Sequence, residues 1–223
     1  MAAARMLSSN IAQRGGRMGI IEILGIAGSL SLLAGWRLYL TILATGTAMH
    51  FGWLPLPEHL ASLKVLAEPW VLGVAAVGTI AEFFADKVAW VDSAWDAIHS
   101  FVRPLGGALL ALALVDASDP AWQVVAFLLG GGGALLSHGA KATTRAVVNA
   151  SPEPFSNIAV SASEDVATGG LLALAIAFPG LAIGIAIVLA LAAVAVIWVL
   201  GRLLCNIRRA LTAAPPAPPL SSD

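Results

Sequence analysis

Four ionisable side chains between residues 92 and 103 are spaced so that a helix would carry them on one face. Asp92, Asp96, His99 and Arg103 follow one another at intervals of four, three and four residues, and residues three or four apart are neighbours on a helix. Carboxylates, an imidazole and a guanidinium in one stripe can bind ions or transfer protons. The spacing predicts a polar site here, with His99 able to titrate near neutral pH.

A second polar stretch has the same spacing. Asn157, Ser161, Glu164 and Thr168 repeat the intervals of four, three and four, and Asp165 adjoins them. The preceding segment reads "NASPEPFSN", and its two prolines remove backbone donors and oppose a regular helix. The second stripe is therefore predicted to begin at a break in the chain's helical structure.

Each polar stretch opens with two charges four residues apart, and the two pairs have opposite sign. Glu82 and Asp86 form the acidic pair, and Lys141 and Arg145 form the basic pair. Similar apolar segments, "GGALLALAL" and "GGLLALAIA", follow the two stretches. This order predicts an internal repeat of two parallel hairpins, a construction known in transporters. Chance similarity in Ala- and Leu-rich sequence is the alternative.

Arg37 is the most isolated charge of the chain. It lies in "LLAGWRLYLTILATG", near the middle of an apolar run at residues 19–49, where a side chain cannot easily reach the membrane surface. A charge at that depth costs roughly 2.5 to 3.5 kcal/mol on insertion scales, so it needs a partner. Arg37 is predicted to face the carboxylates or an anionic ligand.

The elements that must position these side chains are membrane helices. Of 223 residues, 59% are hydrophobic and 11% charged, whereas a soluble domain has about 25% charged residues. Long apolar runs without strict alternation indicate transmembrane helices. The predicted fold is all-α, a polytopic membrane bundle whose two polar stretches are broken or re-entrant segments on the cytoplasmic side. Six spans are expected, at residues 19–49, 69–86, 97–117, 121–141, 157–178 and 180–202.

Basic residues give the orientation. Arginines precede the first predicted span and follow the last, and cytoplasmic segments are enriched in Lys and Arg. An even number of spans then places both termini in the cytoplasm. Residues 1–17 are predicted to be a retained extension, residues 18–203 the transmembrane domain, and residues 204–223 a disordered, proline-rich tail.

Composition excludes several other functions. The formal net charge of −1 gives no basic face for nucleic acid, and no nucleic-acid-binding motif is found. The single cysteine, Cys205, excludes an internal disulfide and a cysteine-built metal site. The expected partners are the lipid bilayer and a small anionic solute or lipid headgroup. The motif "GLAIG" suits helix contacts within the chain or in a homo-oligomer.

Three motifs are shared with a known family: "AGWRLYLTILATG", "EFFADKVAWVDSAWDAIHSFVRPLGGALL" and "SHGAKATTRAVVNASPEPFSNIAVSASED". Over about residues 20–200 the chain resembles the bacterial membrane-protein family catalogued as domain of unknown function 4126. The resemblance implies a protein of the bacterial cytoplasmic (inner) membrane whose signature is the two polar stretches. It implies no activity and no cofactor.

The predicted function is that of an integral membrane transporter, channel or lipid-headgroup translocator with a charged cavity open to the cytoplasm. Broken membrane helices combined with ionisable residues of both signs are typical of substrate and proton pathways. The cations would receive an anionic solute, and the acids would couple its movement to protons or cations. The predicted substrate-binding or ion-pathway residues are Arg37, Glu82, Asp86, Asp92, Asp96, His99, Arg103, Lys141, Arg145, Asn149, Glu153, Asn157, Glu164 and Asp165.

Two other classes remain open. An intramembrane enzyme could use Asp92, Asp96 and His99 with Glu82 or Asp86 to hold a divalent metal and act on a lipid phosphate, because these side chains are suitable ligands. The sequence lacks the companion motifs of lipid phosphatases, however. Alternatively, the charges could join helices in a non-catalytic membrane assembly protein.

Overall fold

The structure is helical throughout the residues that it describes. The computed structural model describes residues 20–52, 64–114, 120–149 and 155–212. These ranges contain no strand, which confirms the predicted all-α class. Their α-helices are α2 (Ile20–Trp36), α3 (Leu38–His50), α4 (Pro69–Ala85), α5 (Ala89–Leu112), α6 (Pro120–Asn149), α7 (Phe155–Ala177) and α8 (Pro179–Thr212).

Length and composition make several of these helices membrane-like. Three apolar helices are long enough to cross a membrane: Pro120–Asn149, Phe155–Ala175 and Gly180–Ala210. Leu24–Trp36 and Pro69–Ala85 are shorter apolar helices. The chain is therefore a helical membrane protein, as its composition predicts.

Large hydrophobic side chains cover the outside of the bundle. Val77, Phe101, Leu128 and Leu191 come from four different helices, and each is more than half exposed. A water-soluble monomer rarely exposes apolar side chains over so wide a surface. In a bilayer the same side chains would be solvated by hydrocarbon, while the helices satisfy their backbone hydrogen bonds internally.

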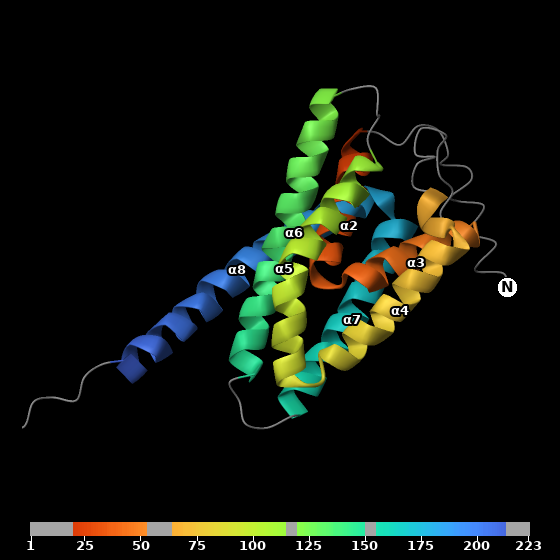
Figure 1. Ribbon diagram of the computed structural model, residues 1–223. Helices are drawn as coiled ribbons and strands as arrows, with labels where there is room; N and C mark the ends of the chain where they lie inside the picture. The colour runs from red at the N-terminus through yellow and green to blue at the C-terminus, as the bar shows by residue number, and fades with distance from the viewer. Residues whose placement is uncertain (1–19, 53–63, 115–119, 150–154, 213–223) are drawn as a thin grey trace, which may run out of the picture.

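The first predicted span, residues 19–49, is not one continuous helix, because two helices meet there at Arg37. This residue has φ −140° and ψ 81°, which lie outside the helical region. In α2, Gly25 packs against Ile183 near the start of α8. At the end of α3, His50 lies 3.2 Å from the carbonyl oxygen of Ala67, just before α4. The chain therefore reverses direction, and α2 and α3 form a hairpin with Arg37 at its tip (Figure 1).

Close backbone contact holds this hairpin against α6. A Cβ atom at Gly35 would overlap the carbonyl oxygen of Ala134, so only glycine allows the approach. On the other face of α2, Ile26, Leu30 and Leu33 belong to the buried apolar core, which also includes residues of α7 and α8. The core fills one end of the bundle, and the tip at Arg37 points away from it.

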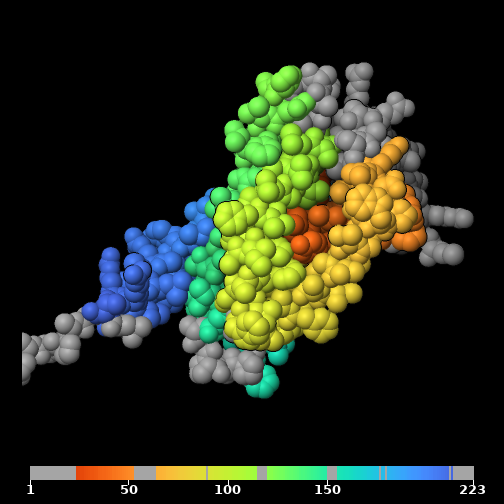
Figure 2. Space-filling view, viewed as in Figure 1, coloured from red at the N-terminus to blue at the C-terminus, as the bar shows by residue number. Residues whose placement is uncertain are grey.

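The polar helix ends gather at the other end of the bundle. α4 ends and α5 begins there, with residues 86–88 between them. α6 ends and α7 begins at the same end, as Figure 1 shows. Figure 2 shows α3 at the base of a hollow between α4 and α5. The arrangement brings both polar stretches next to the hairpin tip.

α5 continues through Pro104, and the first polar stretch is interrupted by the turn at residues 86–88. A proline removes one helical hydrogen bond, and neighbouring helices can compensate for that loss. One boundary prediction is wrong. α8 continues to Thr212, because the residues after 203 include several good helix formers. The first nine residues of the predicted disordered tail are therefore helical. The predicted extension at residues 1–17 and the rest of the tail lie outside the described residues.

Candidate functional site: a buried charge network

The two predicted polar stripes are buried faces of α5 and α7. Their spacing places each stripe on one side of its helix, whereas exposed apolar side chains such as Phe101 and Val166 lie between the stripe positions. The stripes face the hairpin and α6 rather than lipid. The members, each at most 6% exposed, are Asp92, Asp96, His99 and Arg103 on α5 and Asn157, Ser161, Glu164 and Thr168 on α7.

The first group of contacts is the Arg37 cluster, which consists of Arg37, Asp86, Arg145, Glu164 and Asp165. Arg37 pairs with Asp86, and its Nη2 and Nε lie 3.2 Å from Glu164 Oε2 and 3.1 Å from Asp165 Oδ1. Arg145 Nη2 lies 2.7 Å from Glu164 Oε2 and 3.5 Å from Asp86 Oδ2. Two planar guanidinium groups thus share two carboxylates, a geometry that arginine suits better than lysine. The prediction that Arg37 faces carboxylates is confirmed.

The second group is the Arg103 cluster, which consists of Glu82, Asp96, Arg103 and His138. Arg103 Nη2 lies 2.5 Å from Glu82 Oε1, and Nη1 lies 2.9 Å from Asp96 Oδ1. The same Nη1 donates to His138 Nδ1 at 2.6 Å. Since a guanidinium cannot accept a hydrogen bond, Nδ1 must be unprotonated. His138 then carries its proton on Nε2, which lies 2.9 Å from Ser100 Oγ, and the ring is neutral.

His138 was not among the predicted site residues. A signal for it was present, because His138, Lys141 and Arg145 are separated by three and four residues and so share one face of α6. This is the same kind of spacing that identified the stripes of α5 and α7. The structure buries all three side chains.

His99 is held by aromatic neighbours beside the Arg103 cluster. Its Nδ1 lies 2.8 Å from the carbonyl oxygen of Trp95, so this nitrogen must be the donor. Its Nε2 lies 3.1 Å from the Tyr39 hydroxyl, which can donate to it. The imidazole also stacks on Trp95, with ring centroids 4.3 Å apart. Titration of His99 near neutral pH stays a prediction.

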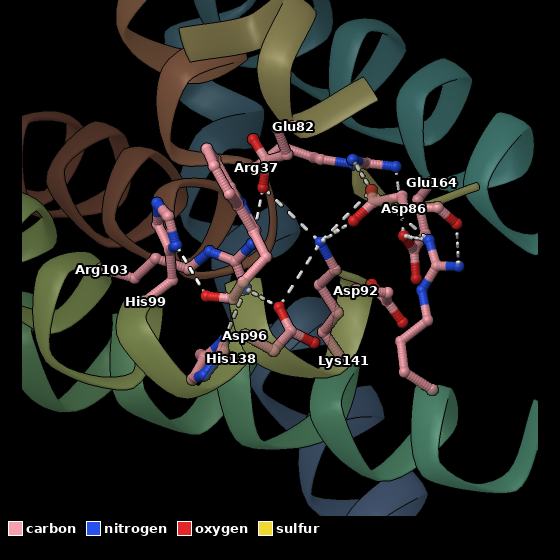
Figure 3. Close-up of polar contacts among 12 residues, drawn as sticks. Arg37, Glu82, Asp86, Asp92, Asp96, His99, Arg103, His138, Lys141 and Glu164 are labelled. Atoms are coloured by element: carbon pink, nitrogen blue, oxygen red, sulfur yellow. Dashed lines mark hydrogen bonds and ion pairs between the residues drawn. The ribbon is translucent and has the colours of Figure 1, made fainter. Parts of the chain in front are cut away.

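Lys141 joins the two clusters. Its Nζ lies 3.4 Å from Asp86 Oδ1, 3.5 Å from Glu82 Oε1 and 3.9 Å from Asp96 Oδ1, and Figure 3 shows it between the two groups. The acidic pair of α4 and the basic pair of α6 therefore face each other, as their opposite charges favour. The internal repeat that their spacing suggested stays a prediction.

The edge of the network is less buried. Lys87, in the turn between α4 and α5, donates to Ser161 Oγ at 2.8 Å and lies 3.8 Å from the Phe83 ring centroid. Burial lowers the pKa of Lys87, although nearby Asp165 raises it. Asp165 is 27% exposed. This edge is where the network comes closest to the outside of the bundle.

The structure brings the predicted site residues together wherever it describes them. Asn149 and Asn157 complete the set: Asn149 donates to Asp92 Oδ2 at 2.9 Å, and Asn157 accepts from Arg145. Glu153 lies outside the described residues. The contacts come from α4, α5, α6, α7 and the hairpin tip, so the convergence of acids and bases from separate helices is confirmed.

The arrangement favours ion pairing and proton transfer over metal binding. Among the described residues, no group of three or more His, Cys, Asp or Glu side chains could hold a metal ion. Asp96 is engaged by Arg103, and both ring nitrogens of His99 have partners. A metal would have to displace these contacts.

Comparison with known proteins identifies one family. Residues 24–199 match the model of a family described as Domain of unknown function (DUF4126). This range contains all residues of the charge network. A search of curated proteins and a search of solved structures each found no match.

Proposed function

We propose that this chain, which belongs to the family described as Domain of unknown function (DUF4126), is a membrane transport protein for an anion, coupled to protons or cations. The observation that carries the proposal is Arg37: a guanidinium 1% exposed, at the tip of a broken helical hairpin, paired with carboxylates from other helices. Irregular backbone at membrane depth and buried charges of both signs mark substrate pathways in transporters.

The anion would take the place of a carboxylate within the network. Arg37 and Arg145 both bind Glu164, and Arg37 also binds the partly exposed Asp165. A carboxylate or phosphate offers the same two oxygens to a guanidinium as these side chains do. The substrate is therefore a small anionic solute or an anionic lipid headgroup, which share this chemistry.

A membrane topology belongs to the same proposal. α4 to α8 each cross the bilayer, and the α2–α3 hairpin enters and returns on one side. Lys87 and the arginines of the α8 end, Arg202, Arg208 and Arg209, mark the cytoplasmic side. The end of α8 is then cytoplasmic and the start of α2 lies on the opposite side, whereas six spans would place both on the cytoplasmic side. Reporter fusions at each terminus test this, and two cytoplasmic termini would contradict it.

Flux measurements in liposomes test the function. Purified wild type is expected to move at least one of three probes: inorganic phosphate, glutamate or a fluorescent phosphatidylglycerol. The phospholipid probe distinguishes a headgroup translocator from a solute transporter. Arg37→Gln should abolish that flux, whereas the matched control Arg202→Gln, which removes an exposed arginine beside Trp198, should retain it. Folded wild type that moves none of the probes, or an active Arg37→Gln variant, would refute the proposal.

A second candidate is a non-catalytic membrane assembly protein. The pairing of the four buried cations with carboxylates favours it, because such pairs can simply fix how helices associate. In that case, neutralising both members of a pair should restore stability and cellular phenotype together. A transport site should remain inactive after the same pair of changes.

A further inference from the structure

The buried network has one more acid than cations. In the part of the chain that the structure describes, five carboxylates and four cations are buried. Adding the half-buried Asp165 and Lys87 keeps the same excess. An uncompensated charge is strongly disfavoured in a low-dielectric interior, and a carboxylate there tends to take up a proton. The buried acids are Glu82, Asp86, Asp92, Asp96 and Glu164, and the cations are Arg37, Arg103, Lys141 and Arg145.

Asp92 is the buried acid that has no arginine or lysine nitrogen within 4.0 Å among the described residues. The other four each lie within 4.0 Å of an arginine or lysine nitrogen. Asp92 is 0% exposed, and its Oδ2 accepts a hydrogen bond from Asn149 at 2.9 Å. Its Oδ1 is buried without a hydrogen-bond donor among the described residues. A proton bound to this oxygen would remove the buried charge and allow the oxygen to donate a hydrogen bond.

An acceptor for that proton is in place. Asp86, at the end of α4, is a neighbour of Asp92 in the network (Figure 3). Arg37, Lys141 and Arg145 surround Asp86 and keep it ionised. An ionised Asp92 would place two carboxylates in contact, whereas a protonated Asp92 can donate to Asp86.

The other groups that face Asp92 do not remove the need for a proton. Asn149 and Arg145 face it from α6, Asp86 from the end of α4, and Asp96 from the next turn of α5. Arg145 is the cation of this set, and it already binds Glu164 and Asn157. The two neighbouring acids oppose ionisation of Asp92.

We propose that Asp92 is a proton-binding site, occupied by a proton that it donates to Asp86 when the network is closed as seen here. On release, the Asp92 O–H bond breaks, the proton passes to water, and the electron pair stays on the carboxylate. The new charge then competes with Glu164 for Arg145. Its use as the coupling site for anion movement rests on the proposed function, but proton binding does not.

Infrared spectroscopy of the full-length protein in lipid membranes tests the proton itself. At neutral pH, wild type is expected to show the carbonyl band of a protonated carboxylic acid. Asp92→Asn should remove this band, while the control Asp165→Asn should retain it. A band that survives in Asp92→Asn, or a folded wild type without the band, would overturn the proposal.

A second variant keeps the test decisive if Asp92→Asn does not fold. Asp92→Glu retains a carboxyl group but changes its environment, so the frequency of the band should shift. An unshifted band would assign the proton to another residue and refute the proposal. Flux is measured separately on wild type. If Asp92→Asn loses the band but wild type shows no proton-dependent flux, the proton site is supported and the proposed transport function is refuted.

Discussion

The Arg37 cluster and the Arg103 cluster both pair a buried arginine with carboxylates, but they differ in how the partners are positioned and how exposed they are. Each surrounds a buried guanidinium with carboxylates, at least one of which comes from another element. In the Arg103 cluster, Arg103 and Asp96 belong to the same helix, and His138 occupies a further donor of Arg103. The side chains of Glu82 and Asp96 in this cluster are 2% and 9% exposed, whereas the side chain of Asp165 in the Arg37 cluster is 27% exposed.

This difference suggests that the Arg103 cluster is a structural anchor between helices and that the Arg37 cluster is a site accessible to a ligand. The Arg103 cluster is buried, and Arg103 and Asp96 are fixed on the same helix, α5. With Glu82 on α4 and His138 on α6, the cluster is suited to holding these three helices together. The Arg37 cluster lies at a helix break and reaches the partly exposed edge near Lys87. Since Lys141 touches acids of both clusters, a change in one is expected to alter the other.

The largest expected effect is the loss of the sealed arginine. Arg103→Gln leaves Glu82 and Asp96 buried, with Lys141 as the remaining cation within 4.0 Å among the described residues, and breaking a buried ion pair costs about 3 to 5 kcal/mol. Arg37→Gln should cost less, about 1 to 3 kcal/mol, because Lys141 and Arg145 still pair with Asp86 and Glu164, and Asp165 is partly exposed. Denaturant titration of both detergent-purified variants measures the difference in unfolding free energy. Equal losses would remove the distinction between the clusters.

Neutralising an arginine together with its carboxylate partners should give different results in the two clusters. Combining Arg103→Gln with Glu82→Gln and Asp96→Asn removes the uncompensated charges and should recover most of the lost stability, about 2 kcal/mol or more. Flux should recover with it if this cluster is an anchor. In the Arg37 cluster, Arg37→Gln with Asp86→Asn should recover stability without flux. Recovery of flux in the second combination would show that Arg37 and Asp86 serve only to hold the helices together and do not bind the anion.

The next largest effect is expected from a change in packing at the α2–α3 hairpin. Gly35→Ala places a Cβ against the backbone of Ala134 and should cost about 1 to 3 kcal/mol through overpacking. It should reduce flux as well, because Arg37 is two residues further along. Gly184→Ala is the matched control: a Cβ there meets nothing within 4 Å, so its effect should stay within about 0.5 kcal/mol. Similar thermal midpoints for the two variants would argue against the close contact.

The smallest predicted effect lies at the edge of the anchor. Ser100→Ala removes the hydroxyl that lies 2.9 Å from His138 Nε2 and should cost about 0.5 to 1.5 kcal/mol. Flux should be unchanged, because neither residue belongs to the Arg37 cluster. Chemical denaturation and flux measured on the same preparation check both parts. A flux defect without a stability change would show that the Arg103 cluster takes part in transport.

Much of the site could be predicted because helix periodicity is local. An interval of four, three and four residues places Asp92 to Arg103 on one face wherever the helix lies, and the cost of a buried charge predicts partners for Arg37. His138 was missed although it shares a face with Lys141 and Arg145. A single histidine in an apolar segment carries little signal until the neighbouring positions on its face are considered together.

The sequence by itself determined the membrane-like helical composition, the two polar faces and the need for their charges to be paired, since these follow from hydrophobicity and helical spacing. Tertiary structure decided which charges meet, which one is left without a cation, and that the chain turns back at Arg37. An apolar run has the same composition whether it crosses a bilayer or reverses within it. Only the close approach of helices, as at Gly35 and Ala134, fixes that outcome.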